Sequence, residues 1–336
     1  MGGKPEVVVI TGASAGVGRA TARAFGKRRA HIGLLARGRE GLEAAKQEVE
    51  AEGGKALVFS VDVANAEQME ATAASVEENF GPIDIWINNA MASVFSPVKE
   101  MTPEEFRRVT EVTYLGYVYG TLSALRRMLP RNHGVIIQVG SALAYRGIPL
   151  QSAYCGAKHA IQGFTESLRC ELLHDESRVR LTMVQMPALN TPQFSWVKNR
   201  LRNKPQPVPP IFQPELAAEA IIWAVEQDRP EVYVGWPTIK AIVLGDKIAP
   251  RLADAYLART GYEAQQTDAP EDRNRPDNLW EPVPGDHGAH GDFDSRAYEK
   301  SWQFYLTKNR RWWAPIGGLV IASLLALMSL KATRPA

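Results

Sequence analysis

The sequence has little cysteine and no excess of charge of either sign. Its two cysteines, Cys155 and Cys170, both fall within a segment expected to form one helix, residues 152–174, where they cannot easily pair. We therefore expect no disulfide framework, and a reducing compartment is the simpler interpretation. Basic and acidic residues number 39 and 37, which gives a net charge of +2, and the basic residues are spread along the chain. Nucleic acid is accordingly not an expected partner.

The N-terminal residues also lack the features of a targeting segment. The apolar run Val7–Ile10 is shorter than a signal peptide needs, and it leads into a glycine-rich loop without a cleavage site. Glu6 stands where an N-myristoylation motif requires serine or threonine, so lipidation of Gly2 is not expected. We interpret the apolar run as a buried strand.

Short apolar runs alternate with helical patterns through most of the chain. At 336 residues and 45% hydrophobic residues, the chain can form one large α/β domain with an appendage. The order predicts a doubly wound, Rossmann-type parallel sheet of about seven strands flanked by helices, with ligands at the carboxyl ends of the strands. The expected strands are 6–10, 31–36, 56–60, 83–88, 134–139, 180–186 and 231–234, and the expected helices are 17–28, 39–52, 66–80, 103–129, 152–174 and 214–226.

One connection, residues 187–213, is too long for this alternation. It carries six prolines and the aromatic residues Phe194, Trp196 and Phe212. A compact domain rarely keeps such a loop without a use, so we expect a lid whose aromatic side chains cover an apolar substrate. A disordered surface excursion is the alternative.

A glycine-rich loop separates the first expected strand from the first helix. In Thr11-Gly-Ala-Ser-Ala-Gly-Val-Gly18, the glycines at 12, 16 and 18 allow backbone amides and a helix N-terminus to face a pyrophosphate. The alternative is that these glycines only make a tight turn.

The end of the second expected strand indicates which dinucleotide fits. An NAD site typically has a carboxylate there, whereas this chain has Leu34-Leu-Ala-Arg37, which favours the 2′-phosphate of NADP(H). A solvated Arg37 is the alternative, and Arg39 could share its role. Asp62, after the third strand, is placed to bind an adenine amino group, although an acid there can also serve only as a cap.

Tyr154 and Lys158 lie four residues apart in the helix expected over residues 152–174, and so share one face of it. A tyrosine titrates near ~10 in water, and it becomes a usable acid or base near neutrality only if something stabilises its phenolate. The charge of Lys158 can do this. The spacing alone is weak, but Ser141 follows the apolar run 134–139 upstream.

Together these motifs resemble the short-chain dehydrogenase/reductase family over roughly residues 5–237. The resemblance rests on Thr11-Gly-x-x-x-Gly-x-Gly18, Asn88-Asn-Ala90, Ser141, Tyr154-x-x-x-Lys158 and Pro187–Thr191, in this order and at these spacings. It implies hydride transfer between a nicotinamide and a carbonyl or alcohol carbon. It also implies that the fourth and fifth helices could pair in a homodimer.

The resemblance implies a role for each site residue. Tyr154 would be the general acid in reduction, Lys158 would lower its pKa and hold the nicotinamide ribose, and Ser141 would bind the substrate oxygen. Asn88 would support the loop after the fourth strand, and Pro187, Ala188 and Thr191 would flank the carboxamide. The expected cofactor-binding residues are Thr11, Gly12, Ser14, Gly16, Val17, Gly18, Arg37, Asp62, Asn89, Tyr154, Lys158, Pro187 and Thr191.

The chain departs from the family pattern at three positions. Met91 and Ala188 replace glycines, which are small backbone changes. Thr113 stands where the family commonly has an asparagine that anchors a water for proton relay from the lysine. One hydroxyl cannot reproduce a carboxamide, so we expect Thr113 to give a changed relay in an active enzyme.

The C-terminal region differs from that of a plain soluble reductase. Residues 312–330 carry no charge and would span about 28 Å as a helix at ~1.5 Å per residue, close to the ~30 Å of a bilayer core. Basic residues flank the run and Trp312-Trp313 suits an interface, so we expect a single-pass anchor with the catalytic domain in the cytoplasm. A docked core helix or an interfacial segment is the alternative, given Pro315 and Gly317-Gly318.

The resulting domain plan has three parts. We expect an NADP-binding catalytic domain over residues 1–240, a helical or irregular extension and linker over 241–311, and the transmembrane helix. Residues 267–294 are rich in charge, proline and glycine and predict a flexible linker, in which His287 and His290 are too isolated for a metal site.

The sequence therefore predicts an NADP(H)-dependent oxidoreductase acting on a carbonyl or alcohol. A hydrophobic substrate is expected from the anchor, the lid and four apolar residues near the catalytic serine and tyrosine, namely Leu143, Tyr145, Ile148 and Leu150. Two alternatives stay open: a membrane-tethered NADP-binding scaffold without turnover, and an epimerase or dehydratase that uses the same tyrosine.

Overall fold

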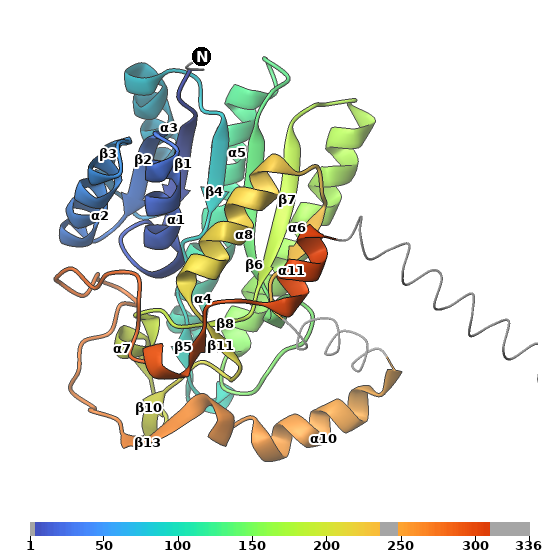
Figure 1. The fold of residues 1–336 in the computed structure, drawn as a ribbon. Helices are drawn as coiled ribbons and strands as arrows, with labels where there is room; N and C mark the ends of the chain where they lie inside the picture. Colours follow the sequence, from blue (N-terminus) through green and yellow to red (C-terminus); the bar gives the residue numbers. More distant parts are fainter. Residues whose placement is uncertain (1–3, 236–247, 310–336) are drawn as a thin grey trace, which may run out of the picture.

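The computed structural model describes residues 4–235 and 248–309, and a seven-stranded parallel sheet forms its centre (Figure 1). The strand order is β3-β2-β1-β4-β6-β7-β12. The chain first adds strands outward from β1 to β3 on one side, and then from β4 to β12 on the other side of β1. The expected doubly wound Rossmann-type sheet is therefore confirmed. Its strands are β1 (Val7–Thr11), β2 (His31–Ala36), β3 (Lys55–Ser60), β4 (Ile85–Asn88), β6 (Val135–Ser141), β7 (Arg180–Met186) and β12 (Glu231–Tyr233).

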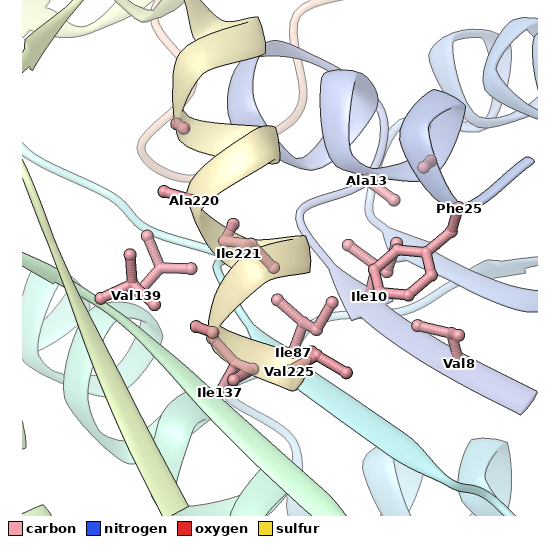
Figure 2. Packing of buried hydrophobic residues seen from close by; sticks show 14 of the residues in the cluster. Val8, Ile10, Ala13, Phe25, Ile87, Ile137, Val139, Ala220, Ile221 and Val225 are labelled. Carbon is pink, nitrogen blue, oxygen red and sulfur yellow. The ribbon is translucent and has the colours of Figure 1, made fainter. Parts of the chain in front are cut away.

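Helices cover both faces of this sheet. On one face α1, α2 and α8 pack against the strands, and on the other face α3, α4, α5 and α6 do so. Successive residues of β1 explain the continuous apolar run, because Val8 and Ile10 join the first core cluster while Val7 and Val9 join the second. Figure 2 shows Ile221 and Val225 of α8 over Ile87 and Ile137 of the sheet. The helices are α1 (Gly16–Lys27), α2 (Arg39–Ala51), α3 (Ala66–Phe80), α4 (Pro103–Thr110), α5 (Gly116–Met128), α6 (Ser152–His174) and α8 (Pro214–Glu226).

The prediction of a single helix over residues 103–129 is wrong in detail, because the structure has two helices in this range. The first of them starts with Pro103 behind a Thr102–Glu105 capping box, but a π-helical turn, Glu111–Leu115, separates α4 from α5. In this turn the Thr113 hydroxyl accepts a hydrogen bond from the Ala92 amide and donates one to the Ala92 carbonyl, both at 2.9 Å. Such turns concentrate at functional sites.

The lid segment, residues 187–213, is ordered by backbone pairing, so it is not the disordered excursion that was the alternative. It contains β8 (Ala188–Leu189), α7 (Gln193–Trp196), β9 (Lys198–Asn199), β10 (Asn203–Pro205) and β11 (Ile211–Phe212). β9 pairs with β5 (Val94–Phe95), β10 pairs with β13 (Gln266–Pro270), and β11 lies between β8 and β14 (Ala297–Tyr298). The C-terminal extension thus holds two of the lid's strands.

The extension packs on the domain, and the expectation of a flexible linker over residues 267–294 is wrong. Leu279 is fully buried in a core cluster and Phe293 is nearly so, which anchors the irregular chain between them. Farther along, Phe304 contacts Trp223 of α8. The extension contains α10 (Pro250–Thr260), α11 (Trp302–Lys308) and the short 3₁₀ turns Glu263–Gln265 and Asp294–Arg296; two more such turns, Val98–Glu100 and Ala142–Ala144, lie in the catalytic domain.

Among residues 4–235 and 248–309, the structure contains no helix that is both long and apolar enough to cross a bilayer. The expected anchor, residues 312–330, lies outside the described residues.

Candidate active site

The glycine-rich loop fits a dinucleotide in its backbone geometry. Gly12 and Gly16 have φ values of +68° and +56°, which a residue with a Cβ rarely adopts. Gly18 faces the Gly12 carbonyl so closely that an added Cβ would collide with it. The N-terminus of α1 is therefore brought against β1 without side chains in between, as pyrophosphate binding requires.

Two side chains fix this loop to the end of β4. The Thr11 hydroxyl accepts hydrogen bonds from the amides of Asn89 (2.8 Å) and Ala90 (3.0 Å). In return, the Asn89 carboxamide donates to the Thr11 carbonyl at 2.9 Å and to that of Gly12 at 3.3 Å. The loop is thereby held in position by the neighbouring strand.

Asn88 has a different place, since it is fully buried in a polar network below the loop. Its amide donates to Gln138 (2.9 Å) and Thr121 (3.1 Å), and its oxygen accepts from the indole of Trp86 (2.9 Å). These contacts tie β4 to β6 and α5. Asn88 supports the strand end, while Asn89 borders the cavity.

Arg37 and Asp62 both face the cavity from the ends of β2 and β3, but neither is free. The Arg37 guanidinium donates to the carbonyls of Trp280 (2.7 Å), Leu279 (3.3 Å) and Asn278. Asp62 accepts from Arg108 at 2.5 Å. Burial, followed by the charge of Arg108, lowers the pKa of Arg37 from its ordinary value. Sequence reasoning missed Arg108 and the segment 278–280, which is distant in the chain.

Ser141, Tyr154 and Lys158 come together at the carboxyl end of β6. Ser141 ends the strand, and α6 presents Tyr154 and Lys158 one turn apart. Burial raises the pKa of Tyr154 above its ordinary value, although its hydrogen bond with Ser141 lowers it in part. Burial also lowers the pKa of Lys158 to about 7. With its pKa raised in this way, the phenol of Tyr154 keeps its proton at neutral pH.

Lys158 is held by a residue that the sequence did not single out. Its ammonium group donates to the Val139 carbonyl at 2.7 Å and to the hydroxyl of Tyr117 at 3.2 Å. Tyr117 is buried in α5, and its own hydroxyl donates to the same carbonyl at 3.0 Å. The Thr113 hydroxyl bonds to the backbone of Ala92. The available sequence signal for this residue was that Tyr117 lies four residues after Thr113, where the chain departs from the family pattern.

A cavity of about 670 Å³ joins these groups. Both the catalytic trio and the glycine loop border it, and so do most of the other predicted site residues. Those that line it are Gly12, Ser14, Gly16, Val17, Arg37, Asp62, Asn89, Ser141, Tyr154, Lys158, Pro187 and Thr191. Thr11, Gly18 and Thr113 lie outside the lining set and act on it through neighbouring backbone.

Apolar side chains form much of the cavity lining. Leu143 and Ile148 border it as expected, together with Phe95, Phe194 and Trp196. Three expected apolar residues have other places. Tyr145 donates to Glu231 at 2.6 Å, Leu150 packs in a cluster with Val197 and Leu201, and Phe212 is buried in the main core.

Comparison with known proteins agrees with this geometry. Residues 6–200, more than half of the chain, match the family described as short chain dehydrogenase. This chain belongs to the short-chain dehydrogenase family. Membership makes it an oxidoreductase of a family that uses nicotinamide cofactors.

Relatives of this short-chain dehydrogenase match between about two thirds and nearly all of its length. It is 31% identical to the uncharacterized oxidoreductase YxnA of Bacillus subtilis, over 98% of this chain and 92% of that protein. It is 30% identical to a fatty acyl-CoA reductase of Acinetobacter baylyi, over 66% of this chain and 73% of that one. Human estradiol 17-beta-dehydrogenase 11 is 28% identical over 76% and 82% of the two chains.

A solved structure has the same fold. The crystal structure of a metagenomic short-chain oxidoreductase in complex with NADP superposes with a TM-score of 0.57 at 26% identity. The match covers 68% of this short-chain dehydrogenase and 96% of that chain.

Proposed function

We propose that this short-chain dehydrogenase uses NADP(H) to interconvert a carbonyl and an alcohol on a hydrophobic substrate, with Tyr154 as the acid and base. One observation carries the proposal. Ser141, Tyr154 and Lys158 border the same cavity as the glycine loop and Arg37, so the proton donor and the dinucleotide site share one space.

The residues of the trio have separate tasks. NADPH, when bound, would supply the hydride. Tyr154 donates its proton to the substrate oxygen, while the Ser141 hydroxyl forms a hydrogen bond to the same oxygen as charge develops there. Lys158, in its charged form, stabilises the phenolate that remains. Because burial raises the pKa of Tyr154, the phenol keeps its proton at neutral pH and can act as the proton donor in reduction.

Several groups suit the phosphates and ribose of NADP(H). The glycine loop and the N-terminus of α1 would hold the pyrophosphate, and Lys158 would hold the nicotinamide ribose. Arg37 would contact the 2′-phosphate, since β2 ends without a carboxylate at this point. The NADP complex of the metagenomic relative supports the choice of cofactor.

The apolar half of the cavity supports a hydrophobic substrate. Phe95, Leu143, Ile148 and Phe194 line it, and residues 206–210 of the lid segment and Ala253, Tyr256 and Leu257 of α10 border the same cavity. The names of two relatives, a fatty acyl-CoA reductase and an estradiol dehydrogenase, point to the same class of ligand.

Membrane attachment through residues 312–330 belongs to the proposal. It is supported by the uncharged sequence and its basic flanks. It is also supported by Trp302, Tyr305 and Leu306 of α11, which are exposed shortly before that segment begins. The catalytic domain would then lie on the cytoplasmic side.

The direct test of the proposed chemistry is Tyr154→Phe. This change removes the proton donor and keeps the ring, so NADPH oxidation with an apolar ketone or aldehyde should fall by at least about 100-fold. NADPH affinity, measured by nicotinamide fluorescence, should stay within about threefold, because the phenol hydroxyl is one contact among many.

Retention of activity in this variant would remove Tyr154 from its role. Binding of NADPH by the wild type without turnover of any carbonyl would instead favour the scaffold.

A further inference from the structure

A C-terminal segment, residues 278–288, lies across the dinucleotide half of the cavity. We call it the strap. It belongs to the orange segment that reaches the lower ends of α1 and α2 in Figure 1. Asn278, Pro282, Val283, Gly285 and His287 line the same cavity as the glycine loop.

One end of the strap is bound where β2 and β3 end. Arg37 donates to three successive carbonyls, those of residues 278–280, and Arg108 donates to the Leu279 carbonyl at 3.1 Å. The side chain of Leu279 is fully buried in the core. This end is therefore a fixed anchor.

The other end of the strap is bound at the glycine loop. The Gly288 carbonyl accepts from the Gly16 amide at 3.1 Å, and Asp286 forms an ion pair with Arg19 of α1 at 2.9 Å. The Arg19 side chain is only 2% exposed, whereas that of Asp286 is 45% exposed. Arg19 also pairs with Glu48 at 2.8 Å.

This second end, where Gly285 also donates to Glu40 and His287 packs against Trp196, can detach without leaving a buried charge unpaired. When Asp286 leaves, its carboxylate returns to water, and Arg19 keeps Glu48 as a partner, so no buried charge is left alone. Gly285 and Gly288 at this end have positive φ angles and supply backbone freedom. Segments held by a few polar contacts open at lower free energy than the core does.

We propose that the strap retains the coenzyme, with the Arg19–Asp286 ion pair as its latch. The strap encloses the adenosine and pyrophosphate half of an NADP(H)-class dinucleotide, and exchange of the dinucleotide requires the latch to open. This inference rests on the proposed function of the same site. Under this proposal, the C-terminal extension controls the rate of coenzyme release.

The test compares Asp286→Asn with Asp292→Asn in the full-length chain. Asp292 is exposed, and the described residues show no hydrogen bond or ion pair for it, so it is a matched removal of charge from the same region. NADPH is preloaded and displaced with excess NADP⁺ while nicotinamide fluorescence is followed. Loss of the latch should speed NADPH dissociation by about five- to tenfold, because breaking a charge pair acts mainly on the off-rate. Asp292→Asn should leave the rate unchanged within about twofold.

A second variant tests the strap by sterics. Gly291 lies three residues after the strap, and a Cβ there would lie 2.5 Å from the Thr191 carbonyl oxygen, so Gly291→Ala should displace the chain that leaves the strap and also speed dissociation. Hydrogen exchange provides a readout that does not depend on turnover: amides of residues 278–288 should exchange more slowly once NADPH is added.

The outcomes separate the two proposals. Equal dissociation rates in wild type, D286N and G291A, with unchanged exchange, would overturn the strap and leave the cofactor assignment standing. Failure of the wild type to bind NADPH would overturn both.

Discussion

In the proposed NADP(H) site, Arg37 is the residue on which we expect cofactor choice to depend most. Its guanidinium is placed by the carbonyls of residues 278–280 at the rim of the cavity. We predict that Arg37→Ala lowers NADPH affinity by about 10- to 100-fold, the loss expected for hydrogen bonds to a charged group. NADH affinity should change much less, as fluorescence titration with both nucleotides would show.

The ratio of the two affinities matters because Arg37 also binds the strap. Loosening of the strap alone would weaken both nucleotides equally. An unchanged NADPH-to-NADH ratio would contradict the contact with the 2′-phosphate.

Lys158 should make stability depend on pH. Burial lowers its pKa to about 7 from an ordinary value of 10.5, so between these values the unfolded chain binds more protons than the folded one. Stability therefore rises with pH across this window, and the cost of the buried charge is fully present below pH 7. Relative to Lys158→Met, the wild type should gain about 2 kcal/mol in free energy of unfolding between pH 7 and pH 9.

Urea denaturation of both proteins at the two pH values measures this gain. Subtracting the free energy of unfolding of one protein from that of the other removes the contribution of groups that titrate alike in both. A constant difference would mean that Lys158 keeps an ordinary pKa in the folded protein.

Single residues also show where sequence reasoning stops. Tyr154 and Lys158 could be placed on one face of a helix, and Ser141 at the end of a strand, because local sequence patterns determine these positions. Tyr117 and Arg108 could not, since each acts through a partner brought near by tertiary packing, Lys158 for one and Asp62 for the other.

At the scale of elements, the glycine loop is the part of the fold that tolerates substitution least. An alanine at position 18 would place its Cβ against the Gly12 carbonyl and the Asn89 carboxamide. We predict that Gly18→Ala destabilises the protein by about 1–3 kcal/mol through overpacking and lowers NADPH affinity at least about tenfold. Thermal unfolding and fluorescence titration measure the two effects.

Gly163 provides the matched control. It is an exposed position of α6 with no atom within 4 Å of an added Cβ, so Gly163→Ala should be neutral or slightly stabilising. Normal NADPH binding by Gly18→Ala would show that the loop does not bind the pyrophosphate.

The regular elements followed from sequence, while the irregular ones did not. Strand β2 and helices α3, α6 and α8 have the predicted bounds, because apolar periodicity and local end signals determine them. The π turn at Glu111–Leu115 and the strap depend on distant contacts, to Ala92 in the first case and to Arg37 and Arg19 in the second. Composition alone made residues 267–294 resemble a linker.

At the scale of the whole molecule, we predict that residues 312–330 hold the protein at a membrane. Deleting residues 312–336 should move the protein from the membrane fraction to the soluble fraction of a lysate. Ile321→Arg is a point variant of the same test, since a central arginine costs about 2.5–3.5 kcal/mol in a spanning helix. It should shift part of the protein to the soluble fraction.

Recovery of the full-length protein in the soluble fraction would contradict the anchor. The homodimer stays a prediction as well. It draws support from the partly exposed Leu122 and Leu129 at α5, one of the helices that would pair.

The measurement that tests the central claim most directly is a titration of the purified full-length protein with NADPH and NADH, followed by a panel of apolar ketones and aldehydes. We predict tighter binding of NADPH than of NADH, and oxidation of NADPH with at least one apolar carbonyl, lost in Tyr154→Phe. Absence of NADPH binding, or turnover that persists without the Tyr154 hydroxyl, would contradict the account.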